Sequence, residues 1–198
     1  MSDIFYAYGG SAYANLTNKC PCRCTFCIRK NGDSVGTATN LWLGKDPSME
    51  DILRELEQFP LRDYPELVFC GYGEPTCAVE NLAATARYVK ENYGIKTRIN
   101  TNGLGNLINQ RDILPEIAPW IDAVSISLNA PTPEKYNAIC HPVYEGAFEE
   151  MLRFAKSCRG VIPEITFTVV DVLPPEDIQA CRQIAEDLGI QFRVRVKE

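Results

Sequence analysis

Four cysteines lie close together near the start of the chain, in the segment Cys20-Pro21-Cys22-Arg23-Cys24-Thr25-Phe26-Cys27. Thiolates spaced this closely are typical ligands of zinc or of iron–sulfur clusters. Zinc usually takes its ligands from two separated pairs, and the chain offers no second pair and only one histidine, His141. The segment therefore predicts an iron–sulfur centre. The other five cysteines are scattered, and we expect most of them to be buried and unreactive: Cys70, Cys77, Cys140, Cys158 and Cys181.

Two ligand sets are contained in this segment. Cys20, Cys24 and Cys27 have the spacing C-x3-C-x2-C, and Cys22 is a fourth thiol between the first two. Three thiolates on a [4Fe–4S] cluster leave one iron open to a non-protein ligand, which favours an enzyme. We expect the Cys22 side chain to point away from those of Cys20 and Cys24. If all four thiols bound the cluster, the protein would instead be a non-catalytic redox or sensor protein.

The composition is that of an ordinary globular domain. The chain has 198 residues, of which 45% are hydrophobic and 23% charged, and its net charge of −6 argues against a coat for nucleic acid or an anionic membrane. No run approaches the roughly 18 apolar residues of a membrane span, and the first residues lack a signal-peptide pattern. We expect a single domain over residues 1–198, located in the cytoplasm.

Short β-rich runs alternate with amphipathic helical patterns along the chain. Two runs on either side of Gly9-Gly10 predict a hairpin, at residues 4–8 and 13–16. Five further strands are predicted, at residues 67–70, 96–101, 123–128, 165–172 and 192–196. Helices are predicted between them, after an N-cap at Ser48 and within residues 79–94, 112–117, 148–155 and 178–188. The alternation predicts parallel strands joined by right-handed crossovers.

We therefore predict an α/β fold. Six βα repeats form a partial barrel with a parallel sheet inside and helices outside, and a short hairpin lies at the N-terminus. A closed barrel of eight units usually takes about 250 residues, and a doubly wound open sheet is the alternative. Polar residues at alternate strand positions favour the barrel, because a sheet covered on both faces would be apolar throughout. We expect these residues to line a wet, ligand-binding concavity: Arg98, Asn100 and Asn102; Ser125, Ser127 and Asn129; Arg193, Arg195 and Lys197. For the last three, a solvated edge is the alternative.

The cysteine triad, with Phe26 just before its last member, resembles the signature of the radical S-adenosylmethionine (SAM) enzymes. Gly71-Tyr72-Gly73-Glu74-Pro75 resembles the Gly-Gly-Glu motif of that family, with Tyr72 inserted. The resemblance implies that this segment contacts the amino group of SAM, and that the fourth and fifth barrel strands hold its ribose, carboxylate and adenine. The implied cofactor-binding residues are Phe26, Gly73, Glu74, Asn102, Ser127, Asn129, Arg98 and Val170.

The resemblance also implies the chemistry. A [4Fe–4S] cluster held by Cys20, Cys24 and Cys27, reduced by an external flavodoxin- or ferredoxin-like donor, would cleave SAM reductively. The 5′-deoxyadenosyl radical so formed would abstract hydrogen from an unknown substrate. The segments 15–20 and 26–29 more closely resemble the TatD-associated radical SAM proteins, a group named for its gene neighbourhood with a TatD-like hydrolase. That resemblance implies a functional link to such a hydrolase.

Little of the chain follows the last predicted strand, so we expect the open end of the partial barrel to need a cover. The loop at residues 28–47, a partner protein or a large substrate could supply it. Small family members that open laterally include activators of glycyl-radical enzymes, so activation of a partner protein is an alternative function. The pair Cys140-His141 is a further candidate for a hydrogen or proton donor.

Overall fold

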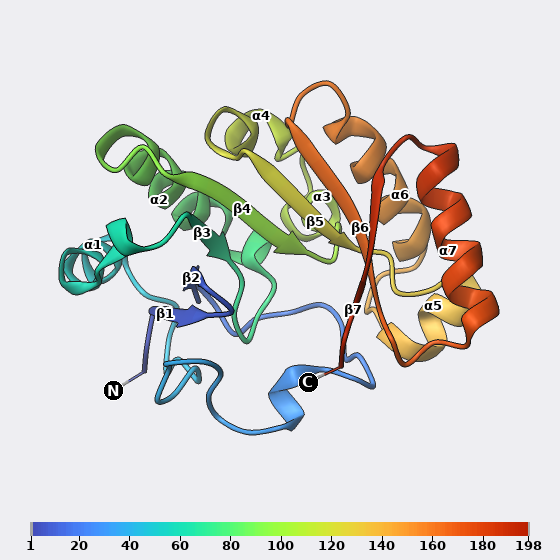
Figure 1. Cartoon of the computed structure of the whole chain (residues 1–198), viewed down its shortest axis with the longest axis horizontal. Coiled ribbons are helices and arrows are strands. Elements are labelled where there is room, and N and C mark those ends of the chain that lie inside the picture. The colour runs from blue at the N-terminus through green and yellow to red at the C-terminus, as the bar shows by residue number, and fades with distance from the viewer. Residues whose placement is uncertain (1, 198) are drawn as a thin grey trace.

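Seven strands form one sheet in which the order in space equals the order in sequence (Figure 1). This computed structural model describes residues 2–197. β1 (Phe5–Tyr8) pairs antiparallel with β2 (Ser11–Ala14), and every later neighbour pair is parallel. The parallel strands that follow β2 are β3 (Glu66–Phe69), β4 (Lys96–Thr101), β5 (Ala123–Ser127), β6 (Glu164–Val170) and β7 (Gln191–Arg195).

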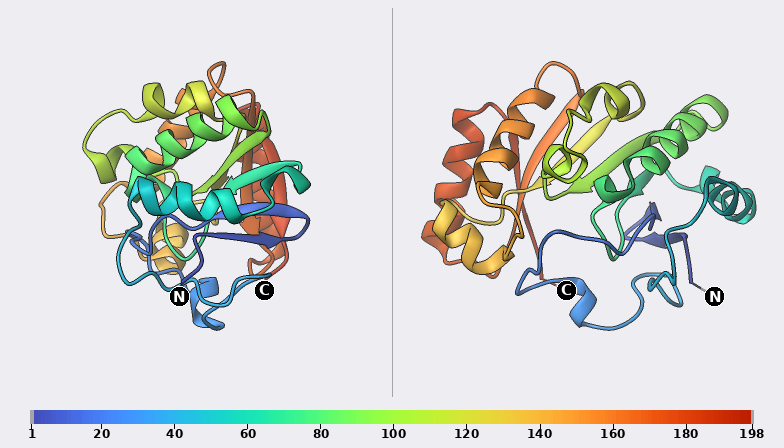
Figure 2. Two further views of the ribbon diagram at one scale, coloured as in Figure 1. Left: turned by 90° about the vertical axis from the view of Figure 1, so that its left-hand side faces the viewer. Right: turned by 180° about the vertical axis from the view of Figure 1, so that it is seen from behind.

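This strand order decides between the two predicted architectures. In a doubly wound sheet the order reverses, which places helices on both faces. Here it never reverses, and the helices lie on the outer, convex face of the curved sheet (Figure 2). The edge strands β1 and β7 do not pair with each other within the described residues, so the barrel is open. The partial barrel of six parallel strands, β2 to β7, is confirmed.

The hairpin β1–β2 turns through Gly9 and Gly10, whose φ angles are 55° and 84°. Two central residues with positive φ define the tight turn that matches the twist of a hairpin. Tyr8 pairs with Ser11, so β2 begins two residues earlier than predicted. The loop with the cysteines follows β2 directly.

The predicted helices are present, and two others had no predicted counterpart. The helices are α1 (Met49–Gln58), α2 (Val79–Asn92), α3 (Gly105–Asn109), α4 (Leu114–Ile117), α5 (Pro133–Cys140), α6 (Ala147–Cys158) and α7 (Pro175–Asp187). Short 3-10 turns are η1 (Ile28–Lys30), η2 (Leu61–Asp63), η3 (Pro75–Ala78) and η4 (Ala118–Trp120). Ser48 caps α1 in a reciprocal capping box with Asp51, as its position predicts. The unpredicted α3 and α5 are short and lack a long apolar stripe. Within residues 2–197, no helix is long and apolar enough to cross a membrane.

Residues alternate between the two faces of the sheet. Most of the side chains that face the helices are fully buried and apolar, among them Leu67, Phe69, Ile99, Val124, Ile126, Phe167 and Val169. Their neighbours in sequence face the concave side and are largely polar, which confirms the predicted polar concavity. Burial of the apolar face against the helices supplies the main driving force for folding.

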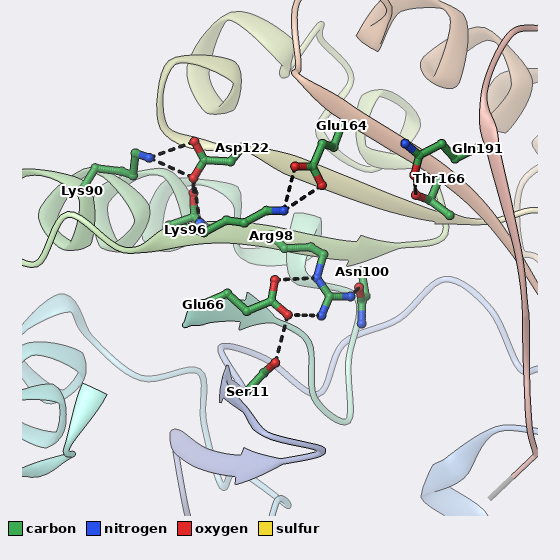
Figure 3. Close-up of polar contacts among 11 residues, drawn as sticks. Ser11, Glu66, Lys90, Lys96, Arg98, Asn100, Asp122, Glu164, Thr166 and Gln191 are labelled. Carbon is green, nitrogen blue, oxygen red and sulfur yellow. Dashed lines mark hydrogen bonds and ion pairs between the residues drawn. The ribbon is translucent and has the colours of Figure 1, made fainter. Parts of the chain in front are cut away.

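Charged pairs tie the amino ends of the strands together (Figure 3). Arg98 forms two bonds to the Glu66 carboxylate, at 2.6 and 3.1 Å, and Lys96 pairs with Glu164 at 2.7 Å. Asp122 accepts from Lys90 Nζ at 2.8 Å and from the Thr97 backbone N–H at 2.8 Å. It thus joins α2, the start of β4 and the turn before β5.

We expect Asp122→Asn to lower the free energy of unfolding by about 1–3 kcal/mol at pH 7, because Lys90 and Thr97 lose a charged acceptor. Burial alone would raise the pKa of Asp122, but the Lys90 and Thr97 bonds outweigh it and lower the pKa from 3.8. A carboxylate with a lowered pKa stabilises the fold above its ordinary pKa and loses that contribution as the pH falls through the folded pKa. Urea unfolding should therefore show a difference between variant and wild type that shrinks below about pH 4. Glu91→Gln, in the exposed Arg87–Glu91 pair, is the control and should change stability little. An equal effect of both variants would contradict the assignment.

Candidate active site at the carboxyl ends of the strands

The cysteine loop is anchored first by the segment that follows β3. The Glu74 backbone N–H donates to the Lys19 carbonyl at 2.8 Å. At Gly73, a Cβ atom would lie 2.1 Å from the Thr17 carbonyl oxygen, so only glycine permits this approach. The predicted Gly-Gly-Glu-like segment therefore holds the chain immediately before Cys20.

A second anchor comes from the end of α5. The backbone N–H groups of Arg23 and Thr25 donate to the carbonyls of Cys140 and Ile139, at 3.0 and 2.8 Å. Val143 N–H donates to the Pro21 carbonyl at 2.9 Å. The loop is thus bound on both sides of Cys22 and is not free to extend.

The expectation that Cys22 points away from its neighbours is wrong. Cys22 is only 3% exposed, and its thiol contacts those of Cys20 and Cys24 through side-chain hydrogen bonds. Asn102 Nδ2 lies 3.8 Å from the Cys22 sulfur. The cause is the anchoring to α5, which curls the loop and directs the middle thiol inward.

Two of the three predicted cluster ligands are held in a state that favours the thiolate. Hydrogen bonds from Cys140 and Cys22 lower the pKa of Cys24 to about 3, and the bond from Cys22 lowers that of Cys20. The thiolate is the form that ligates metals. The donor set therefore fits a [4Fe–4S] cluster by its chemistry.

Cys27, the third predicted ligand, has a different partner. Arg29 Nε donates to its sulfur at 3.4 Å, while Arg29 Nη1 donates to the Asn18 carbonyl at 3.1 Å. The three predicted ligands share one loop, but their side chains do not converge on one point. Among residues 2–197, no three Cys, His, Asp or Glu side chains are arranged as a metal site. The assignment of the triad as the ligand set stays a prediction.

Cys140 was expected to be a packing thiol or a weak donor candidate, and it lies in this site. It is fully buried, and its hydrogen bond to Cys24 and its burial raise its pKa. Asn129 Nδ2 donates to the Cys140 sulfur at 3.5 Å. His141 beside it is exposed, with a left-handed φ of 44°. No sequence signal marked the contact with Cys24, because the two residues are far apart along the chain.

Asn129 carries an unsatisfied acceptor. Its Oδ1 is buried and has no hydrogen-bond partner anywhere in the described chain, and its backbone is left-handed with φ 58°. A buried polar atom without a partner costs free energy, so such atoms are rare unless a ligand or water completes them. An oxygen acceptor at the carboxyl end of β5 fits a ligand that carries hydroxyl or amino groups, as SAM does.

Glu74 is 3% exposed and joins several elements. Its Oε1 accepts from Thr76 Oγ1 at 2.7 Å and Thr101 Oγ1 at 2.6 Å, and its Oε2 accepts from the Asn102 backbone N–H at 2.8 Å. Burial raises the pKa of Glu74 despite these bonds. The carboxylate thus caps η3 and fixes the end of β4. Its predicted contact with the SAM amine stays a prediction.

The remaining predicted cofactor residues fall into two places. Ser127 and Val170 lie on the concave face, Ser127 opposite Thr168 in the ladder, and Phe26 packs half-buried beside the cysteines. Arg98 on β4 is bound to Glu66 instead, four residues before Asn102, which directly follows that strand. Four strand residues span about 13 Å. The structure therefore separates Arg98 from the other predicted residues and places it at the amino ends of the strands.

A sequence model of the Radical SAM superfamily matches residues 14–188. The chain belongs to this superfamily. The radical SAM domain thus spans the sheet from β2 to the end of α7. At this level the predicted enzyme class and the predicted cofactors, a [4Fe–4S] cluster and SAM, are confirmed.

Individual relatives are distant. The UPF0026 protein slr1464 of Synechocystis is 31% identical over 102 residues, which is 52% of this chain and 37% of that protein. The dual-specificity RNA methyltransferase RlmN of Halorhodospira halophila is 24% identical over 189 residues, covering 89% of this chain and 49% of the relative. The chain spans less than half the length of each.

Solved structures share the fold. SuiB of Streptococcus suis bound to S-adenosylmethionine superposes with a TM-score of 0.64 at 17% identity, over 94% of this chain and 38% of SuiB. The radical SAM methyltransferase TsrM of Kitasatospora setae, with cobalamin and a [4Fe–4S] cluster bound, gives 0.60 at 13% identity, over 90% of this chain and 32% of TsrM. The open, mostly parallel sheet is therefore a radical SAM fold.

We expect Gly73→Ala to impair cluster loading, because its methyl group must displace the chain before Cys20. Overpacking of this kind costs about 1–3 kcal/mol of stability. After anaerobic reconstitution, iron content and the 400 nm absorbance should fall relative to wild type. Gly44→Ala is the matched control, since a Cβ at Gly44 meets nothing within 4 Å. Equal iron content in the two variants would show that the approach at Gly73 does not position the loop.

Proposed function

We propose that the protein cleaves SAM reductively on a [4Fe–4S] cluster held by Cys20, Cys24 and Cys27 and acts on a substrate in the concavity. When bound, the cluster and SAM would supply the 5′-deoxyadenosyl radical that removes a hydrogen atom from the substrate. The proposal depends on one observation. Two thiols with lowered pKa, Cys20 and Cys24, lie at the same end of the sheet as Asn129 Oδ1, which has no hydrogen-bond partner among the described residues.

The chain's own residues would bind and orient SAM in this scheme. Glu74 would accept from the ammonium group, since its Oε2 accepts only from Asn102 N–H among the bonds described. Asn129 Oδ1 would accept from a hydroxyl or amino group of SAM. Ser127 and Val170 would line the ribose and adenine side on β5 and β6. Phe26, Gly73 and Asn102 would complete the pocket beside the cysteines.

We further propose that the protein belongs with the TatD-associated radical SAM proteins. The segment that carries this resemblance has a defined structural task. Asn15 and Asn18 each donate to the Leu41 carbonyl at 2.9 Å, and Thr17 donates to Asp46 at 2.7 Å. These bonds fasten the loop 28–47 beneath the cysteine loop (Figure 1). A functional link to a TatD-like hydrolase, a flavodoxin- or ferredoxin-like electron donor and a cytoplasmic location are parts of this proposal.

Cysteine variants test the ligand set. We expect Cys20→Ala, Cys24→Ala and Cys27→Ala each to lose the cluster, because each would remove one iron ligand. Cys22→Ala should keep it and, with dithionite and SAM under anaerobic conditions, should still form 5′-deoxyadenosine. Iron analysis, electron paramagnetic resonance of the reduced cluster and chromatography of the nucleoside are the measurements.

Cys158→Ala on α6 is the control for the loss of a buried thiol. Loss of the cluster in Cys22→Ala, with Cys158→Ala intact, would favour a four-thiolate redox or sensor protein. A cluster-loaded wild type that forms no 5′-deoxyadenosine would refute SAM cleavage. A glycyl-radical signal on an added candidate partner would identify the activating-enzyme alternative.

Glu74→Gln tests the proposed contact with the SAM amine. A charge-assisted hydrogen bond contributes about 1.5–3 kcal/mol, so we expect SAM to bind at least about 10-fold more weakly. Equilibrium binding to the cluster-loaded protein measures this, and the unfolding midpoint checks the caps at η3 and β4. Glu80→Gln, on the exposed surface of α2, should leave the SAM affinity unchanged. Unchanged affinity in Glu74→Gln would limit Glu74 to its structural role.

A further inference from the structure

The concave face of β5, β6 and β7 is organised in three rows set by the strand register. The floor row is Ser125, Thr166 and Gln191. The middle row is Ser127, Thr168 and Arg193. The upper row joins Val170 to Arg195 and lies level with Asn129, which follows β5. Successive rows are two residues, or about 6.6 Å, apart.

A cavity of about 240 Å³ lies at the floor row. Five charged residues line it: Glu66, Lys96, Arg98, Glu164 and Arg193. Four of them neutralise one another in the pairs Arg98–Glu66 and Lys96–Glu164 (Figure 3). Arg193 belongs to neither pair, so the cavity lining has a net charge of +1.

Arg193 and its neighbour Arg195 have no counter-ion within residues 2–197. Neither guanidinium takes part in any hydrogen bond or ion pair described there. Arg195 is exposed to solvent, yet Cys70, Tyr13 and Cys24 lie near enough across the concavity to influence its pKa. Desolvation by these surroundings and the nearby charge of Arg193 lower the pKa of Arg195. Arg193 and Arg195 are thus two neighbouring cations in the concavity that no anionic side chain of the described residues neutralises, although the protein has a net charge of −6.

We propose that Arg193 and Arg195 bind an anionic group of the substrate, a phosphate or a carboxylate. The inference rests on the proposed function, which places SAM at Asn129 and Val170, on the β5 and β6 part of the upper row, whereas Arg195 lies at the β7 end of that row. A substrate whose hydrogen is abstracted there must extend toward the floor, and Arg193 lies one row, about 6.6 Å, in that direction. Guanidinium groups bind phosphates and carboxylates in a bidentate manner, and the hydroxyls of Ser125 and Thr166 line the same cavity as Arg193 and are further donors.

The rival interpretation is that the two arginines are solvated side chains of an edge strand. Arg182 provides a matched control for that possibility. It stacks on the ring of Phe192 at 4.9 Å, and Phe192 faces the helices from the same strand. Arg182→Gln therefore removes the same charge from the opposite side of β7.

The experiment measures the binding of inorganic phosphate and of malonate to the full-length, cluster-loaded protein by titration calorimetry at low ionic strength. We expect one of the two anions to bind saturably and about 10-fold more weakly to Arg193→Gln or Arg195→Gln, since each variant loses a charge-assisted bond. Arg182→Gln should bind as wild type does. A preference for phosphate or for malonate identifies which anionic group the site takes.

Three outcomes would overturn the proposal. They are no saturable binding of either anion to the wild type, equal weakening by Arg182→Gln, and weakening of SAM binding by Arg193→Gln as large as that of anion binding. The last result would assign the arginines to SAM instead of the substrate. The readout is separate from SAM cleavage, so a protein that binds the anion but forms no 5′-deoxyadenosine would refute the proposed function and leave the anion site standing.

Discussion

The close approach of Gly73 to the Thr17 carbonyl is the constraint on which the site depends. It brings the end of β3 against the chain that leaves β2, and so fixes where the cysteine loop begins. The next residue, Glu74, adds two contacts. Its backbone N–H binds the start of the cysteine loop, and its carboxylate binds the end of β4. Neighbouring strands are therefore joined at the point where the predicted cluster ligands lie.

The second support of the loop comes from much later in the chain. The end of α5 binds the main chain on both sides of Cys22 and places Cys140 against Cys24. A loop held at both ends by backbone bonds has little freedom left, which favours a preorganised ligand set. The arrangement buries a group of thiols, and it leaves Asn129 Oδ1 without a hydrogen-bond partner among the described residues.

Much of the fold could be predicted from sequence, because the strands alternate clearly and each is followed by a helix. The polar faces of β4, β5 and β7 were visible as alternation, and the cysteine spacing indicated the cofactor. The inward turn of Cys22, the site position of Cys140 and the ion pair of Arg98 with Glu66 were not predictable. Each depends on contacts between residues far apart in the chain, which local pattern does not encode. α5 was missed because it is short, although Thr132 caps it and Pro133 at its first position is itself typical of a helix start.

The unreversed strand order has a consequence for how this protein can vary. Each strand contributes one column of side chains to the concave face, and each column is supported by its own crossover. A substitution on β7 changes the edge column alone, whereas the cysteine loop is held by β3 and α5 at other points of the sheet. The cysteine loop and the arginines of β7 thus depend on different strands of one sheet. Under the proposed function, a substitution on β7 would change the proposed anion site and leave the supports of the cysteine loop intact.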